Sequence, residues 1–204
     1  MALLQTLWGT VLMGIGIALL LHARLGLLPL DVFHAALADR MGWSVGVAFT
    51  VTQAVFLLLY VPLRIRWGIG TLAAAVVPAI VCDGMTRAVP PAEHILLRAG
   101  FLLLGTVAFV VGVAAYLAAD LGALPRDGVM IEMARRRRRS LASVRVLFDL
   151  AALLAGVLLL GPASAIDRGV VGIASIVLAM LLGPLILRAL PQFALVSGSR
   201  RLVR

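Results

Sequence analysis

The chain has 204 residues, of which 63% are hydrophobic and 13% charged, and its mean hydropathy is +1.12. This composition excludes an ordinary soluble domain, which would carry many more polar residues. The net charge is +9, and arginine supplies all 18 basic residues. In a soluble protein such a charge would suggest nucleic acid binding. Here the arginines lie between apolar segments, where they are expected to fix membrane topology.

Six apolar runs are each long enough to cross a bilayer as helix, which takes about 20 residues. We therefore expect an all-α, polytopic membrane protein whose first run is retained as a helix. Two shorter segments, 27–41 and 124–138, contain a proline near their start and internal charges, so we expect short helices there that do not cross. The six crossing runs cover roughly residues 3–22, 45–63, 69–87, 96–119, 142–161 and 169–190.

The arginines are unevenly divided between the two sides that this layout creates. With the N-terminus inside the cell, loops 62–68 and 120–141 and the C-terminal tail, together with Arg145 and Arg188 at their edges, hold 13 of the 18. The positive-inside rule then predicts that both termini are cytoplasmic. The 13 are Arg64, Arg66, Arg126, Arg135, Arg136, Arg137, Arg138, Arg139, Arg145, Arg188, Arg200, Arg201 and Arg204.

An internal repeat becomes visible when the sequence is shifted by 96 residues. Segment 7–31 then lies over segment 103–127, with 13 of 25 positions identical. Three crossings per copy is an odd number, so the second copy must enter from the opposite side, as in many secondary transporters. We expect a first repeat at 1–91, a second repeat at 92–190 and a basic cytoplasmic tail at 191–204. In each repeat a short broken or re-entrant helix follows the first span.

The repeated Leu-Gly-x-x-Pro-x-Asp element and the Gly-Ile-Gly-Thr turn at 68–71 resemble the YczE/YyaS/YitT group of bacterial integral membrane proteins, in particular its YczE-like branch. The stretch Pro125–Gly128 and the later pair Arg145 and Asp149 are similar to the second half of that group. The resemblance implies the six-span architecture and a bacterial inner-membrane location. It implies no particular activity, because none is established for the group.

The repeated element has two interpretations. Gly26 permits a turn, Pro29 suits the first position of a helix, and Asp31 lies in the first turn, where a carboxylate favours the helix dipole. Gly122, Pro125 and Asp127 follow the same pattern, so both elements are explained as ordinary helix starts. Alternatively, both short helices are re-entrant and meet at a polar site, where the two aspartates bind a cation or amine or carry a proton.

Two further groups of charges are candidates for contact with a solute or with lipid. Arg145 and Asp149 are four residues apart in the fifth run, so they share a helix face, either as a simple ion pair or as part of a site. Their counterparts in the first repeat are Phe49 and Gln53. A run of five arginines is expected to anchor topology and contact anionic lipid headgroups; it comprises Arg135, Arg136, Arg137, Arg138 and Arg139.

The other chemistry-bearing patterns are absent from the sequence. The three histidines lack metal-ligand spacing, no phosphate-binding loop occurs, and no serine has a histidine–acid arrangement nearby. We therefore expect no enzyme activity, no metal, no cofactor and no nucleic acid partner. The preferred hypothesis is a small-solute secondary transporter or permease, and the alternative is a non-transporting membrane protein that assists a partner complex.

Glycine spacing in the first and fourth runs adds a prediction about packing. Gly9 and Gly16 lie seven residues apart, as do Gly105 and Gly112. Small residues on one helix face let two backbones approach closely. This contact is expected either within the bundle or across a homodimer.

Overall fold

The computed structural model describes residues 1–197, of which nine segments are helical and none forms a strand. Six helices in this part are long and apolar enough to cross a membrane: α1, α3, α4, α5, α7 and α9. The prediction of an all-α membrane protein with six candidate spans is therefore confirmed. The helices are α1 (Ala2–Ala23), α2 (Pro29–Met41), α3 (Val45–Leu63), α4 (Ile69–Ala88), α5 (Ile95–Ala118), α6 (Pro125–Arg137), α7 (Leu141–Leu160), α8 (Pro162–Asp167) and α9 (Ile173–Ser197).

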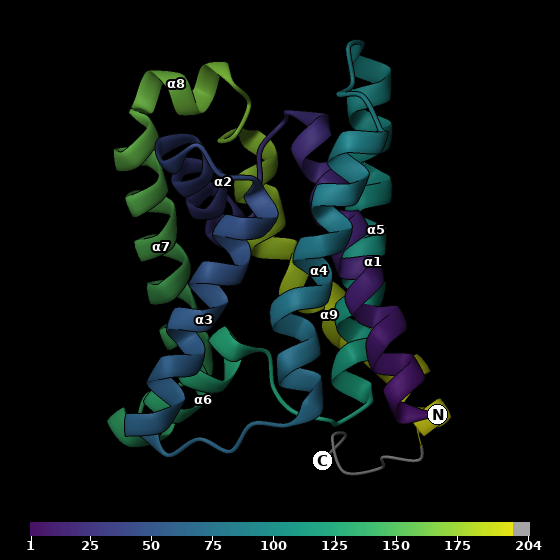
Figure 1. The fold of residues 1–204 in the computed structure, drawn as a ribbon, viewed down its shortest axis with the longest axis vertical. Coiled ribbons are helices and arrows are strands. Elements are labelled where there is room, and N and C mark those ends of the chain that lie inside the picture. The colour runs from purple at the N-terminus through teal and green to yellow at the C-terminus, as the bar shows by residue number, and fades with distance from the viewer. Residues whose placement is uncertain (198–204) are drawn as a thin grey trace.

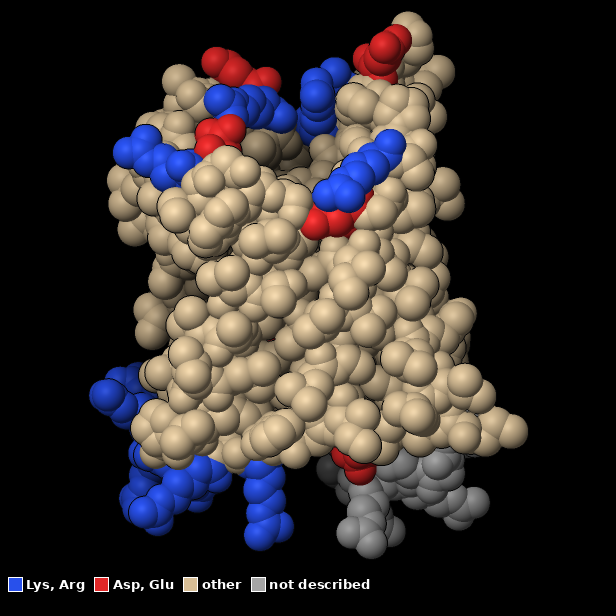
Figure 2. Space-filling model, in the orientation of Figure 1, with Lys and Arg blue, Asp and Glu red and all other residues tan. Residues whose placement is uncertain are grey.

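The outer surface matches a lipid environment. Large apolar side chains such as Leu150 of α7 and Met180 of α9 are more than half exposed. Figure 2 shows a broad band without charged side chains, with mainly basic groups at the lower end and several groups of both signs at the upper end. Exposed leucines are stable in contact with lipid tails and unfavourable in water, so this band is the membrane-facing surface.

The most extensive helix pairing in the bundle is that of α1 and α5, which run side by side (Figure 1). A Cβ built on Gly9 would lie 2.7 Å from the carbonyl oxygen of Gly112, and one on Gly16 would lie 2.8 Å from that of Gly105. The contact therefore needs glycine, and its pairing is antiparallel. The close approach predicted from the glycine spacing is thus made within the bundle.

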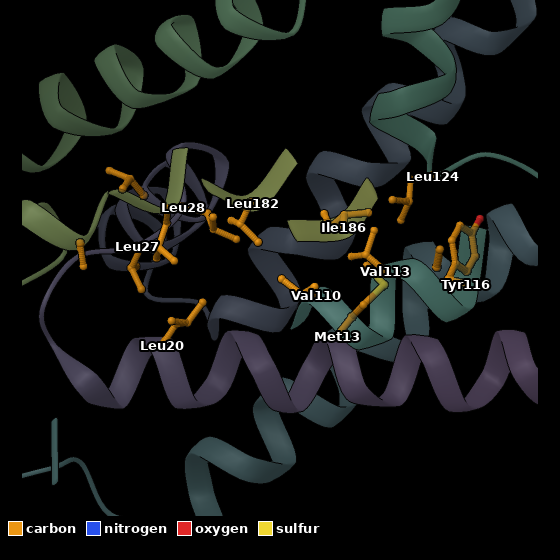
Figure 3. Packing of buried hydrophobic residues seen from close by; sticks show 14 residues of the cluster. Met13, Leu20, Leu27, Leu28, Val110, Val113, Tyr116, Leu124, Leu182 and Ile186 are labelled. Carbon is orange, nitrogen blue, oxygen red and sulfur yellow. The ribbon is translucent and has the colours of Figure 1, made fainter. Parts of the chain in front are cut away.

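An apolar core lies along this crossing (Figure 3). Met13 and Leu20 of α1 pack with Val113 of α5 and Leu182 of α9. Leucines from the loops before α2 and α6 join the same cluster, and Leu124 marks the second of these loops. The two loops are therefore held inside the protein by their side chains.

Both short helices begin inside the bundle and end at its surface. In α2 the residues from Pro29 to His34 are mostly buried, whereas Arg40 and Met41 are exposed. In α6 Pro125 is fully buried and the terminal arginines are exposed. Figure 1 shows the two helices toward opposite ends of the molecule. Neither is a candidate span, and their observed bounds agree with the predicted segments to within two residues.

The loops that enter the bundle are fixed by matching backbone hydrogen bonds. Ala174 N donates to Leu25 O at 3.3 Å, which ties the first loop to the start of α9. Gly70 N donates to Leu121 O at 3.0 Å, which ties the second loop to the start of α4. Leu25 and Leu121 are equivalent positions in the 96-residue shift. Each half of the chain therefore holds the entering loop of the other.

The last predicted run differs from the structure. It was expected to start at residue 169, but α9 begins at Ile173, and the short helix α8 precedes it. Gly169 takes a φ of +65°, a conformation that ends helical continuity, and Pro162 suits the first position of α8. At the other end α9 continues to Ser197, so the tail predicted at 191–204 starts within a helix. Arg200, Arg201 and Arg204 of that tail lie outside the described residues.

Candidate functional site

A network of ion pairs lies where the second short helix begins. Arg126, the second residue of α6, donates from Nε to Asp127 at 3.3 Å and from a terminal nitrogen to Asp149 of α7 at 3.2 Å. Arg145 adds a longer pair to the other oxygen of Asp149, at 3.8 Å. All four charges therefore converge on one place, and the predicted pairing of Arg145 with Asp149 is found with a further cation beside it.

This network is largely withdrawn from solvent. The side chains of Arg126, Asp127 and Asp149 are only about one-fifth exposed. Burial acts to lower the pKa of the Arg126 guanidinium, but the attraction of Asp127, Asp149 and Asp31 outweighs it, and the pKa is raised. The aspartate of the first short helix thus acts on the network of the second.

A second polar group lies at the start of α2. Asp31 is 5% exposed and His34 is completely buried, and His34 Nδ1 lies 3.1 Å from Asp31 Oδ1. The imidazole packs edge-on against Phe49 of α3, with ring centroids 5.0 Å apart. One turn further along α3, Gln53 is also buried. A carboxylate, an imidazole and an amide are therefore enclosed in an apolar part of the bundle.

A cavity of about 420 Å³ opens between α2, α3, α6 and α7. Arg126 and Thr52 supply its polar atoms, and Leu30 and Phe33 line it from the helix that carries Asp31. The rest of its wall consists of apolar side chains of α3 and α7, including Phe56 and Ala151. The space is almost wholly apolar, and Arg126 is the one charged residue among the described residues of its wall, so it suits the apolar part of a small molecule beside a buried cation.

A polar hollow of about 440 Å³ lies at the opposite end of the bundle from the arginine run, at the upper end in Figure 2. Its wall includes His22, Arg24 and Asp83. Asp83 accepts hydrogen bonds from Gly46 N at 2.8 Å and from the Ser44 hydroxyl, so it caps the start of α3.

The predicted glycines and prolines shape the two loops. Gly26 and Gly122 take φ values of +123° and +128°, which favour glycine, and Pro29 and Pro125 open α2 and α6. A Cβ on Gly26 would meet the hydroxyl of Ser175, and one on Gly122 would meet that of Thr71. These four residues position the aspartates but offer no side-chain chemistry of their own.

The arginine run lies apart from this network, at the exposed end of α6. Arg135 and Arg136 hold Glu132 with hydrogen bonds of 2.6 to 2.9 Å, and Arg136 also donates to Leu63 O at the end of α3. Two of the five arginines therefore have protein partners. Arg137, Arg138 and Arg139 are exposed, and their contact with lipid headgroups stays a prediction.

The hydrogen bonds from Arg135 and Arg136 lower the pKa of Glu132 to about 2, below its ordinary value of 4.5. A lowered pKa stabilises the folded protein above about pH 4.5, and that contribution is lost as the pH falls toward 2. Glu132→Gln should therefore lower the apparent melting temperature at pH 7 but make no difference near pH 2. Glu93→Gln, at an exposed loop position, is the matched control. A Glu132→Gln effect that is equal at both pH values would contradict this assignment.

Arg126, His34 and Gln53 are functional candidates that the sequence analysis missed. Arg126 was assigned to topology, although it replaces Leu30 at the equivalent repeat position. His34 lies three residues after Asp31, a helical spacing that places the two side chains together. Of the predicted residues, the structure brings together Arg145, Asp149 and Asp127, with Asp31 close by. Within residues 1–197, no group of three or more His, Cys, Asp or Glu is placed to hold a metal ion.

Comparisons with known proteins agree with the resemblance seen in the repeated element. The model of a family of unknown function, DUF6198, matches residues 2–189. An uncharacterized protein of Haemophilus influenzae is 29% identical over 180 residues, covering 88% of this chain and 79% of that protein. The uncharacterized membrane protein YczE of Bacillus subtilis is 27% identical over 187 residues, covering 90% and 83%. No solved structure matches the chain significantly.

Proposed function

We propose that this chain, which belongs to DUF6198, a family of unknown function, is a secondary transporter or permease for a small solute. The proposal is drawn from its buried charges. The observation that carries this proposal is the ion-pair network of Arg126, Asp127 and Asp149, with Asp31 nearby, beside a cavity inside a membrane bundle. Ionisable groups in a membrane are costly and are retained mainly where they bind or move a ligand.

The inverted repeat is part of the proposal, and recurring contacts support it. Gly68 N donates to the Thr71 hydroxyl at the start of α4, and Gly172 N donates to the Ser175 hydroxyl at the start of α9, both at 3.3 Å. Each of these helix starts receives the loop of the other half. Two broken helices at corresponding positions of two inverted halves form the site in many transporters.

A protein that alternates its access needs openings toward both sides. The cavity at Arg126 lies between α2, α3, α6 and α7, and the polar hollow at Asp83 lies between the ends of α1 and α4 and the start of α3. The arginine-rich end is taken as cytoplasmic by the positive-inside rule, which also places the N-terminus there. In this orientation the exposed arginines of α6 face the anionic inner leaflet.

The test is uptake into proteoliposomes, with a panel of labelled amines, amino acids and carboxylic acids. Asp127→Asn should abolish most of the uptake of whichever solute the wild type transports, because Arg126 loses a charged partner at the site. Asp39→Asn, which alters an exposed carboxylate paired with Arg168 at the end of α2, should leave uptake unchanged. Equal uptake by all three proteins would reject the site. A panel without any uptake would favour the alternative, a membrane protein that assists a partner complex.

A further inference from the structure

The polar group at the start of α2 has unused hydrogen-bonding capacity. Asp31 Oδ2, His34 Nε2 and Gln53 Oε1 are buried, and none has a hydrogen-bond partner among the described residues. A buried polar atom without a partner costs about 1–3 kcal/mol, so each such atom calls for a partner, which can be a water, an ion or a proton. All three side chains are at least 95% buried, which distinguishes them from ordinary surface groups.

The charges in this part of the bundle do not balance. The carboxylates are Asp31, Asp127 and Asp149, and the guanidiniums are Arg126 and Arg145. Asp127 and Asp149 each have an arginine within 3.3 Å, whereas the ion pairs found in residues 1–197 give Asp31 only His34. With neutral histidine, one negative charge is left over, and it belongs to Asp31. An uncompensated charge inside a membrane protein is unfavourable unless a cation neutralises it.

We propose that the Asp31–His34 pair binds one exchangeable proton and that this proton is the coupling ion, an inference that rests on the proposed transport function. An ionised carboxylate only accepts hydrogen bonds, so Nδ1–H of neutral His34 donates to Asp31 and leaves a lone pair on Nε2. A proton from water adds to that lone pair and gives an imidazolium. The pair then changes from a net charge of −1 to 0, and no other reactant is needed.

The surroundings favour this assignment over protonation elsewhere. Histidine is the side chain whose charge ordinarily changes between pH 5 and 8. The imidazole of His34 packs against the ring of Phe49, which keeps water away from the pair. The other titratable or charged groups on elements near the pair are Asp149 and Arg145 of α7, Arg126 and Asp127 of α6, and Cys82 and Asp83 of α4.

The structure suggests how the proton and the solute are coupled. Asp31 acts electrostatically on Arg126, so the charge of the Asp31–His34 pair is felt in the ion-pair network. When the pair is neutral, Arg126 is attracted to Asp127 and Asp149 alone. Proton uptake at α2 therefore changes the balance of charge at α6, and the two helices line the same cavity through Leu30, Phe33 and Arg126. The two broken helices would then have different roles, with ion binding in the first and solute binding in the second.

The test is a nitrogen-15 NMR titration of histidine in the full-length protein. The chain has three histidines, so the double variant His22→Gln/His94→Gln leaves His34 as the only signal. The nitrogen shifts distinguish the two neutral tautomers from the imidazolium. Between pH 9 and pH 5, His34 should change from the Nδ1-protonated tautomer to the imidazolium. Adding Asp31→Asn should move this change to lower pH by about 1–3 units, because the opposite charge is removed.

Three results would overturn the proposal. His34 could stay neutral over the whole range, Asp31→Asn could leave the midpoint unchanged, or the midpoint could shift when sodium chloride replaces choline chloride. The last result would identify a metal cation in place of the proton. The titration needs no transported solute, so it separates the two proposals. If His34 titrates but no solute is taken up, the proton site is supported and the transport proposal is not. If solute is taken up but His34 stays neutral, transport is supported and the proton site is not.

Discussion

Replacing Arg126 with Gln is expected to lower the free energy of unfolding by about 3–5 kcal/mol, the cost of removing one partner from a buried ion pair. Asp127 and Asp149 would both lose their guanidinium, and both side chains are only about one-fifth exposed. The cost is measured as a fall in apparent melting temperature in detergent. Transport of any solute found in the uptake panel should be lost together with stability.

Three comparisons make this prediction specific. Arg40→Gln removes an exposed arginine at the end of α2 and should leave the melting temperature unchanged. Combining Arg126→Gln with Asp149→Asn should restore part of the lost stability, because one of the two stranded carboxylates is neutralised. Arg126→Lys keeps the charge but not the forked geometry that joins two carboxylates, and it should fall between wild type and Gln. A single Arg126→Gln variant as stable as wild type would show that the network contributes little.

Gly112→Ala is expected to destabilise the bundle by about 1–3 kcal/mol, the usual cost of overpacking a tight contact. The added methyl group would lie 2.6 Å from the carbonyl oxygen of Gly9 and 2.8 Å from the backbone nitrogen of Met13. Both atoms belong to the backbone of α1, so no side-chain rotation relieves the clash. The two helices must separate, and the apolar core along their crossing loosens with them.

The matched control is Gly100→Ala in the same helix. A Cβ there would meet nothing within 4 Å. Alanine is the better helix former by about 1 kcal/mol, so this variant should be as stable as wild type or slightly more stable. The measurement is the apparent melting temperature of both variants in one detergent. If Gly112→Ala and Gly100→Ala had the same apparent melting temperature, the close approach of α1 and α5 would not be a determinant of stability.

The architecture was predictable because membrane crossing imposes simple requirements. Run length gave the boundaries of α3 exactly as observed and those of α1, α4, α5 and α7 to within about one residue. Proline and glycine marked the short helices, because they determine where a helix can begin and where a turn is possible. The short helix α8 was missed because six residues give too little periodicity to recognise, and its neighbour α9 was consequently started too early.

The candidate site was only partly predictable. Asp31, Asp127, Arg145 and Asp149 were identified because charges are rare in apolar sequence. Arg126 was counted among the loop arginines, since a sequence does not show that α6 begins inside the protein. His34 was set aside because metal-ligand spacing was the only pattern sought for histidine, and its partner Phe49 comes from another helix. Contacts between elements depend on packing that periodicity alone does not specify.

The exchange of loops between the two halves has a consequence for biosynthesis. The loop at Leu25 completes its backbone hydrogen bonds only with Val170 and Ala174, residues that leave the ribosome much later. Until then its polar backbone must be shielded by water at the membrane surface or by the insertion machinery, because lipid offers no hydrogen-bond partners. The first half therefore stays incomplete until the start of α9 is made, whereas the loop of the second half finds its partner in α4, which is already present.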